Sequence, residues 1–331
     1  CGMTVSEEFG GQGMDYLSYI IAVEELARID GSQAATIAAH NSLGTGPLYN
    51  FGSPEQKEKY LPSLCSGKAL WAFGLTEPEA GSDSRGTKTV ARLENDEWII
   101  NGSKIFITNG ATEITTGATV QVVSGEKDGK KEYSTIIVES DNPGFDAVEM
   151  HDKFCWRASN TSQLFFDNAR VPESNLLGAR GEGSKIMLTT LDSGRLSIAA
   201  MGLGLAQGAY EMGLKYAQER KQFGQPLTKF QAIAFKLADM ATKIELARNL
   251  LYKACWLKDN GKPFGKEAAM SKLYCSEIAK EVADEAVQIH GGYGLMEEYE
   301  IERFYRDQRI LQIGEGTSEI QRIVISRHIG C

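Results

Sequence analysis

The sequence predicts an α+β protein with several domains, in which an all-β block lies between two helical blocks. Apolar residues recur at helical spacing before residue 67 and after residue 182, whereas the segment between them consists of short apolar runs broken by turn residues. The strand–helix alternation of a doubly wound sheet is missing. We therefore expect an N-terminal helical domain at 1–67, a β domain at 68–181 and a C-terminal helical domain at 182–331.

The composition is that of an ordinary globular protein. The 331 residues are 42% hydrophobic and 24% charged, and they exceed the length of a typical single core. The net charge of −9, without long blocks of like charge, argues against a nucleic-acid surface. No apolar run approaches the roughly 18 residues of a membrane span, so we expect neither nucleic acid nor membrane as a partner.

Six cysteines lie far apart and form no C-x-x-C pair. In a chain of this length, that pattern is typical of free thiols in a reducing compartment, which fits the cytoplasm or, in a eukaryote, the mitochondrial matrix. The chain begins CGMTVSEEFGG, without an initiator methionine or a targeting segment, so we expect an incomplete N-terminal domain.

Two helices are well marked in the first block. In SPEQKEKYLPSL, Ser53 stands as an N-cap before Pro54 at the first helical position. In MDYLSYIIAVEELARID, near-helical spacing predicts a stripe made of Leu17, Ile20, Ile21, Glu24 and Leu26.

The β block contains hairpin signals. In EWIINGSKIFIT, Asn101-Gly102 matches the two positive-φ positions of a type I′ turn. A second hairpin is expected around GEKDGKKE, and QLFFDNARVP reads as a final strand that ends at Pro172.

Two long helices are expected in the last block. The second begins near Gly265 and stops at Gly291-Gly292. The first carries an apolar stripe typical of a bundle, made of Phe230, Ile233, Leu237, Met240, Ile244, Ala247, Leu251 and Ala254.

Several motifs point to no chemistry. GSDSRGTKT departs from a phosphate-binding loop because Thr87 separates Gly86 from Lys88, and GLGLAQG lies inside a helical pattern, where close packing explains its glycines. His151 and Cys155 lack a second pair of metal ligands, and no hydrolase motif is present. We therefore expect no metal.

Other segments allow two interpretations each. AFGLTEPEAGSD and FITNG are either strand ends or binding loops, and LDSGR starts a helix with either a salt bridge or a ligand-binding arginine. After RKQFGQP, Thr228 and Gln231 match a capping box. In IGEGTSEIQ, Glu315 is either an acidic residue favoured at a helix N-terminus or a proton acceptor, and local grounds alone favour the former.

Eight segments in this order change that balance. AFGLTEPEAGSD, NGSKIFITNG, WRASNTSQLFFDNARVP, LDSGRLSIAA, ERKQFGQPLTKFQ, QIHGGYG, FYRD and IGEGTSEIQR together resemble the acyl-CoA dehydrogenases, in particular the short-chain, butyryl-CoA dehydrogenase-like members. The resemblance covers Gly2 to Ile329 and implies a helical N-terminal domain, a middle β-barrel and a C-terminal four-helix bundle. It also implies that roughly the first tenth or more of the family's length is missing.

The resemblance implies FAD as cofactor and a homotetramer in which one subunit helps to hold its neighbour's FAD. Residues matched to the flavin and its phosphates are Phe73, Leu75, Thr76, Ser82, Phe106 and Thr108. Residues matched to the adenosine side across a subunit contact are Arg220, Gln222, Phe223, Gln231, Gln288, Gly291 and Gly292, and Thr317 and Glu319 close the site.

The implied reaction is the oxidation of a saturated acyl-CoA to the trans-2-enoyl-CoA, a step of fatty-acid β-oxidation. Glu315 would remove the α proton, the β hydride would pass to flavin N5, and electron-transferring flavoprotein would accept the electrons. Ser82, Asp192 and Arg195 would contact the CoA arm. Some members carry the base before that arginine, where this chain has Gly194.

Two alternatives stay open at this stage: an enoyl-CoA reductase that uses the same site in reverse, and a non-catalytic relative that binds acyl-CoA or a partner protein.

One departure from the family's sequence pattern concerns the substrate. Many short- and medium-chain members have tyrosine before the catalytic glutamate, where this chain has Gly314, so we expect a site that admits a branched, cyclic or bulkier acyl group.

Overall fold

The computed structural model describes all 331 residues, which form two compact units. We call the first the sheet unit; it comprises Cys1–Asp15, Thr36–Asp152 and Ser159–Gly194. We call the second the bundle unit; it comprises Tyr16–Ala35, Lys153–Ala158 and Arg195–Cys331. The three predicted domain ranges remain a prediction.

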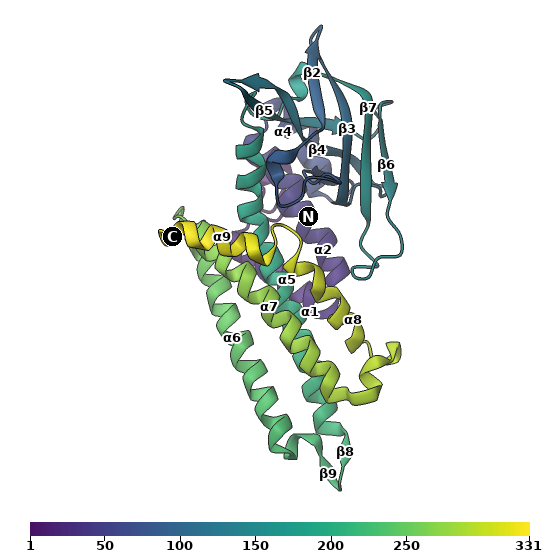
Figure 1. The fold of residues 1–331 in the computed structure, drawn as a ribbon, viewed down its shortest axis with the longest axis vertical. Helices are drawn as coiled ribbons and strands as arrows, with labels where there is room; N and C mark the ends of the chain where they lie inside the picture. Colours follow the sequence, from purple (N-terminus) through teal and green to yellow (C-terminus); the bar gives the residue numbers. More distant parts are fainter. The chain divides into compact units, whose positions relative to one another are not determined.

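The sheet unit is built on a curled seven-stranded sheet with the order β1-β4-β2-β3-β7-β6, and β5 pairs with β4 (Figure 1). The strands are β1 (Leu70–Gly74), β2 (Val90–Glu94), β3 (Glu97–Thr108), β4 (Thr115–Lys127), β5 (Lys130–Glu139), β6 (Phe145–Glu149) and β7 (Thr161–Pro172). β1 and β4 are parallel, whereas β3–β7 and β4–β5 are antiparallel. The predicted all-β block and its final strand ending at Pro172 are confirmed.

The first hairpin turn was predicted at the wrong place. β3 runs unbroken through Asn101-Gly102, and the turn lies at Asn95-Asp96, where both residues have positive φ. Gly102 instead occupies a bulge with φ of 143°, where a Cβ atom would approach the Cα atom of Thr89 to 2.7 Å. This glycine is therefore required by a close approach of two backbones. The second hairpin is confirmed, with Asp128 and Gly129 at its turn.

Short helices complete the sheet unit. They are α3 (Gly46–Phe51) and α4 (Pro54–Cys65), with 3₁₀ turns at Glu7–Phe9, Ser84–Gly86 and Glu173–Asn175. Ser53 caps α4 as predicted, and Gln56 completes a capping box. A π-helical turn, His40–Thr45, follows α2 (Gly31–Ala39). The buried His40 ring donates from Nε2 to the Leu64 carbonyl (3.0 Å) and accepts at Nδ1 from the Trp71 N–H (3.3 Å).

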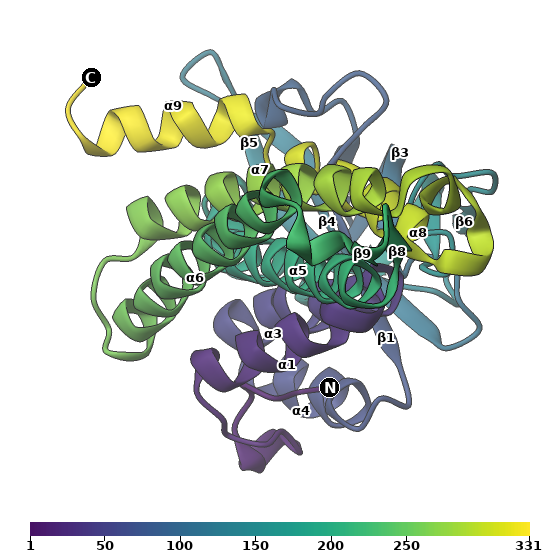
Figure 2. The same cartoon turned by 90° about the horizontal axis from the view of Figure 1, so that it is seen from below.

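The bundle unit is helical, and its long helices α6 and α7 run side by side (Figure 2). Its helices are α1 (Tyr16–Ile29), α5 (Gly183–Glu219, which begins in the sheet unit), α6 (Gln231–Asp259), α7 (Gly265–His290), α8 (Ile301–Asp307) and α9 (Ser318–His328). Further 3₁₀ turns lie at Leu227–Lys229, Gly291–Leu295, Glu297–Tyr299 and Gln308–Gln312. The predicted stripe of α6 is buried from Leu237 to Ala254, and α7 ends before Gly291 as expected.

Three helical predictions need correction. In α1 the buried face also uses Tyr16, Tyr19 and Val23, whereas Ile21 and Leu26 are exposed, because aromatic residues carry part of the packing. LDSGR lies inside α5, which begins at Gly183 and not at this motif. The N-cap of α6 is Phe230, whose side chain makes no capping hydrogen bond. The predicted Thr228–Gln231 capping box therefore does not form.

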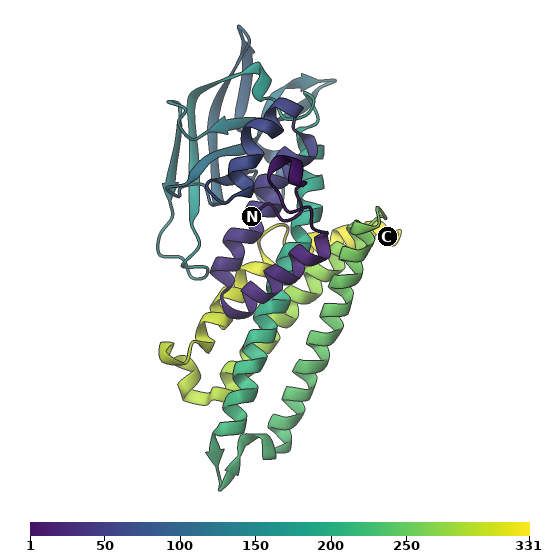
Figure 3. The ribbon, with the colours of Figure 1, turned by 180° about the vertical axis from the view of Figure 1, so that it is seen from behind.

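The glycines of GLGLAQG allow close helix packing, as predicted. A Cβ atom on Gly204 or Gly208 would lie 2.2 Å from the carbonyl oxygen of Glu24 or Arg28, respectively, so α1 packs directly against the backbone of α5. Figure 3 shows the β8–β9 hairpin, Lys221–Gln222 paired with Gln225–Pro226, where the chain passes from α5 to α6.

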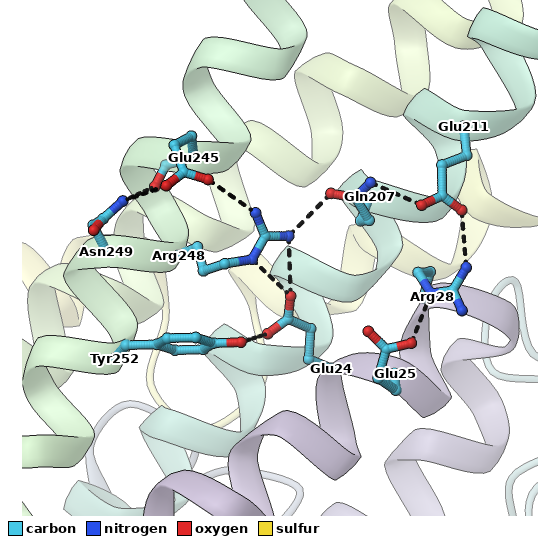
Figure 4. Close-up of polar contacts among 9 residues, drawn as sticks. All are labelled: Glu24, Glu25, Arg28, Gln207, Glu211, Glu245, Arg248, Asn249 and Tyr252. Carbon is cyan, nitrogen blue, oxygen red and sulfur yellow. Dashed lines mark hydrogen bonds and ion pairs between the residues drawn. The ribbon is translucent and has the colours of Figure 1, made fainter.

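A polar network fixes α1 against α5 and α6 (Figure 4). Glu24, 3% exposed, accepts from Arg248 Nε (3.1 Å) and the Tyr252 hydroxyl (2.8 Å). Arg248 also donates to Gln207, which in turn donates to Glu211. These bonds compensate the burial of the Glu24 carboxylate.

Two further predictions concern the whole chain. All six cysteines are free thiols, as expected. No helix has both the length and the apolar character needed to cross a membrane.

Candidate functional site

Glu315 lies in a strained loop and not at a helix cap. The N-cap of α9 is Thr317, whose side chain accepts from the backbone N–H of Ile320 (3.3 Å). Glu315 precedes this cap by two residues and has φ of 52°, a left-handed conformation that is unfavourable for a side chain of its size. The following Gly316 is also left-handed, with φ of 89°. Glu315 is therefore not the N-cap of α9.

One oxygen of the Glu315 carboxyl, Oε2, is enclosed and lacks a hydrogen-bond partner. Burial raises the pKa of this carboxyl from 4.5 to about 7, although the positive charges of Lys272 and Arg195 act in the opposite direction. A carboxylate with this pKa and an unused acceptor atom can take a proton near neutral pH.

Two predicted segments meet in the sheet unit. The backbone N–H of Ile105 in β3 donates to the Thr76 carbonyl (2.9 Å), so the loop after β1 lies beside the strand that carries Phe106 and Thr108. Phe106 has φ of 60° at a bulge and its side chain is 64% exposed. The other predicted residues range from buried Phe73, through half-buried Leu75 and Thr76, to exposed Ser82.

A buried ion pair anchors this loop. Lys104 Nζ in β3 lies 2.7 Å from Glu77 Oε1, with side chains 0% and 5% exposed. Glu77 also accepts from the backbone N–H groups of Thr89 (3.1 Å) and Lys88 (2.7 Å). Burial alone would raise the pKa of Glu77, but Lys104 and the backbone donors lower it below 4.5. The sequence prediction missed this pair because nothing in the pattern distinguishes a buried lysine from an exposed one.

Four predicted residues come together in the bundle unit. Arg220, Gln222, Gly291 and Gly292 line an open pocket of about 620 Å³. The remaining lining residues, which sequence reasoning missed, are Tyr216, Leu227, Ile289, His290, Tyr293, Met296 and Glu298.

The pocket is lined by aromatic rings, an arginine side chain and the exposed backbone of two glycines. Tyr216 stacks on His290 with ring centroids 4.2 Å apart, and Arg220 lies over the Tyr293 ring at 5.5 Å. A Cβ atom on Gly291 or Gly292 would meet nothing within 4 Å, so their backbone is open to a ligand. Rings that stack, a guanidinium and accessible backbone fit an adenosine with its phosphates. The residues present therefore fit part of FAD.

Other predicted residues lie outside this pocket. Gln288, Gln231 and Phe223 do not line it; Phe223, at the tip of the β8–β9 hairpin, is 94% exposed. Asp192 lies in the part of α5 that belongs to the sheet unit, and the buried Arg195 begins the bundle-unit part. Thr317 and the exposed Glu319 flank the start of α9, and Gly314 precedes the base.

Models of three protein-family domains match the chain in order. They are the acyl-CoA dehydrogenase N-terminal domain over residues 1–68, the middle domain over 72–169 and the C-terminal domain over 181–330.

Individual relatives agree with these matches. The chain is 52% identical to the probable acyl-CoA dehydrogenase YngJ of Bacillus subtilis over 328 residues, which is 99% of this chain and 86% of the relative. It is 46% identical to the short-chain specific acyl-CoA dehydrogenase of Clostridium acetobutylicum, with the same coverage.

Solved structures show the same fold. Butyryl-CoA dehydrogenase from Megasphaera elsdenii superposes with a TM-score of 0.96 at 45% identity, covering 99% of this chain and 86% of that one. A chain solved in work on the electron transferring flavoprotein of Acidaminococcus fermentans gives 0.96 at 47% identity and covers 100% and 86%. An acyl-CoA dehydrogenase complexed with FAD from Bacillus anthracis gives 0.93 at 38% identity and covers 99% and 59%. The protein therefore belongs to the acyl-CoA dehydrogenase family and is an FAD-dependent oxidoreductase that acts on acyl-CoA.

Proposed function

We propose that the protein oxidises a saturated acyl-CoA to the trans-2-enoyl-CoA, with Glu315 as the base that removes the α proton. The observation that carries this proposal is the enclosed, unpartnered Oε2 atom of Glu315, together with the pKa raised to about 7. An α C–H beside a thioester is too weak an acid for water at neutral pH, so a desolvated carboxylate is needed. Bound FAD supplies the acceptor for the β hydride.

The loop around Glu315 suits this role. As the α proton leaves, negative charge develops on the thioester oxygen, and we assign the Glu315 backbone N–H as one of its hydrogen-bond donors. The side chain and the N–H of one residue would then act on the same substrate carbon and its carbonyl. This placement explains why the chain keeps a glutamate in a left-handed conformation between two glycines.

The remaining roles are proposals that rest on the family match. FAD would contact Phe73, Leu75, Thr76, Ser82, Phe106 and Thr108 of the sheet unit, and Arg220, Gln222, Phe223, Gln231, Gln288, Gly291, Gly292, Thr317 and Glu319 of the bundle unit. Ser82, Asp192 and Arg195 would bind the CoA arm. The exposure of Phe223 supports a contact with another subunit in a homotetramer. Electron-transferring flavoprotein is the proposed electron acceptor.

Gly314 supports a proposal about the acyl group. A Cβ atom there would meet only Ile310, at 3.7 and 3.8 Å, which is ordinary contact, and Gly314 does not have positive φ. The backbone therefore does not require glycine at this position. We propose that the missing side chain leaves room for a branched, cyclic or bulkier acyl chain beside Glu315.

The test is anaerobic reduction of the bound flavin by added acyl-CoA. The loss of the flavin's visible absorbance (bleaching) measures this reduction. The wild type should bleach, and Glu315→Gln should keep its flavin but fail to bleach. Glu277→Gln is the control. Glu277 forms a surface ion pair with Arg322, so the flavin of this variant should bleach like that of the wild type. Bleaching by Glu315→Gln at the wild-type rate would disprove the assignment of the base.

A further inference from the structure

Lys272 is a buried lysine without a carboxylate partner. It lies in the middle of α7 and its side chain is 0% exposed. No carboxylate oxygen lies within ion-pair distance of its Nζ atom, which instead donates to the carbonyl of Gly316 (2.6 Å). Burying an ammonium group in this way is costly, so its presence calls for a functional explanation.

The acceptor of Lys272 is the backbone directly after the base. The Gly316 carbonyl also accepts from Gln321 Nε2 (2.9 Å), and the Gln321 side chain is 0% exposed as well. Gln321 Nε2 reaches the Glu315 carbonyl too, at 3.4 Å. Two buried side chains, one from α7 and one from α9, thus hold the carbonyls of the two left-handed residues, Glu315 and Gly316.

The charge of Lys272 also acts on the base. The ammonium group lowers the pKa of Glu315 and thereby opposes the effect of burial, while Glu315 raises the pKa of Lys272. Burial lowers the pKa of Lys272 to about 8. The other charged groups that face this lysine are Arg195 from α5, which also lowers the pKa of Lys272, and Glu319 from α9, which raises it.

We propose that Lys272 is a positioning residue for the reaction: its ammonium group holds the Gly316 carbonyl, and so fixes Glu315 in its left-handed conformation, and its charge favours the ionised form of the Glu315 carboxyl. This inference rests on the proposed role of Glu315 as base. Lys272 would act in two ways, through its hydrogen bond and through its charge. Mutations can distinguish the two, because Gln321 donates to the same Gly316 carbonyl but carries no charge.

The test measures removal of the α proton separately from hydride transfer. In 3-thiabutyryl-CoA, sulfur replaces Cβ, so no β hydride can leave, and hydrogen–deuterium exchange at the α carbon in D2O reports the base alone. The exchange rate is measured against pH for the FAD-loaded wild type and for four variants: Lys272→Met, Gln321→Leu, Lys280→Met and Glu315→Gln. Lys280 is an exposed lysine on the same helix and serves as the matched control.

Lys272→Met should lower the exchange rate at pH 7 by about 10- to 100-fold, and it should raise the midpoint of the pH profile by about one unit. Gln321→Leu should lower the rate without moving the midpoint. Lys280→Met should change neither. If Lys272→Met does not fold, Lys272→Gln replaces it, because the amide keeps a donor without the charge; it should move the midpoint with a smaller loss of rate.

The outcomes separate the two proposals. An unchanged rate and midpoint in Lys272→Met, or an unmoved midpoint in Lys272→Gln if that variant is needed, would overturn the role of Lys272. If Glu315→Gln abolishes exchange in the same experiment, the base assignment stands. Exchange that persists in Glu315→Gln would instead remove the base assignment itself, whatever the lysine variants do.

Discussion

The buried ion pair between Lys104 and Glu77 gives a quantitative prediction for the loop that we assign to the flavin. Lys104→Met removes one partner and leaves the Glu77 carboxylate buried. Loss of one partner of a buried pair typically costs about 3–5 kcal/mol. Because Glu77 keeps the backbone donors of Thr89 and Lys88, we expect the lower end, about 3 kcal/mol. For a unit of this size, that corresponds to a fall in Tm of about 6–12 °C.

The assay is differential scanning calorimetry of the FAD-loaded protein, with Lys88→Met as the matched control. Lys88 lies beside the same loop and pairs with Glu79, but both side chains are largely exposed, at 68% and 69%, so this pair contributes little. The control should lose less than about 1 kcal/mol of stability. A double variant, Glu77→Gln/Lys104→Met, should be less destabilised than the sum of the single variants, because no buried charge is left unpaired. A Tm for Lys104→Met equal to that of Lys88→Met would refute this reasoning.

Three further predictions test other parts of the structure. Gly102→Ala should lower Tm more than Gly129→Ala in calorimetry, because both sites have positive φ but only Gly102 would bring a Cβ atom to 2.7 Å from a backbone atom; equal losses would contradict the close approach. Burial lowers the pKa of His40 below 6.5, so its contribution to stability is present above that pH and is lost as the pH falls. In urea unfolding, the free energy of unfolding should therefore fall less between pH 7 and pH 5 in His40→Gln than in the wild type. Gly314→Tyr should shift flavin reduction towards short straight-chain acyl-CoAs, and an unchanged rank order across a substrate panel would remove Gly314 from the specificity argument.

The sequence predicted the helix–sheet–helix order because hydrophobic periodicity is a local property. Asn101-Gly102 and Asn95-Asp96 are both suited to a turn, and neither dipeptide shows that Gly102 lies against Thr89 in a bulge, so the first hairpin turn is misplaced. In α1, the spacing of the aliphatic residues does not indicate that Tyr16 and Tyr19 share the buried face.

The candidate site shows the same limit. Glu315 could be found from the order of motifs along the chain, whereas Lys272 and Gln321 are polar residues of helices, and helical spacing alone does not indicate that they are buried. Tyr216 lies only three residues before the predicted segment ERKQFGQPLTKFQ, but its place in the pocket depends on α7, which brings His290 against it. These residues are determined by packing between distant elements, which a single sequence does not reveal.

Two buried carboxyl groups illustrate why Glu315 is assigned to chemistry and Glu77 to structure. Glu77 accepts three hydrogen bonds, including one from a lysine, and its pKa lies below the ordinary value. Such a group is stable as a carboxylate and has no tendency to take a proton at neutral pH. Glu315 has an enclosed oxygen without a partner, a strained backbone and a raised pKa. The strain and the missing hydrogen bond cost stability, and the raised pKa favours proton transfer near neutral pH, so these features support the proposed role of Glu315 as a base.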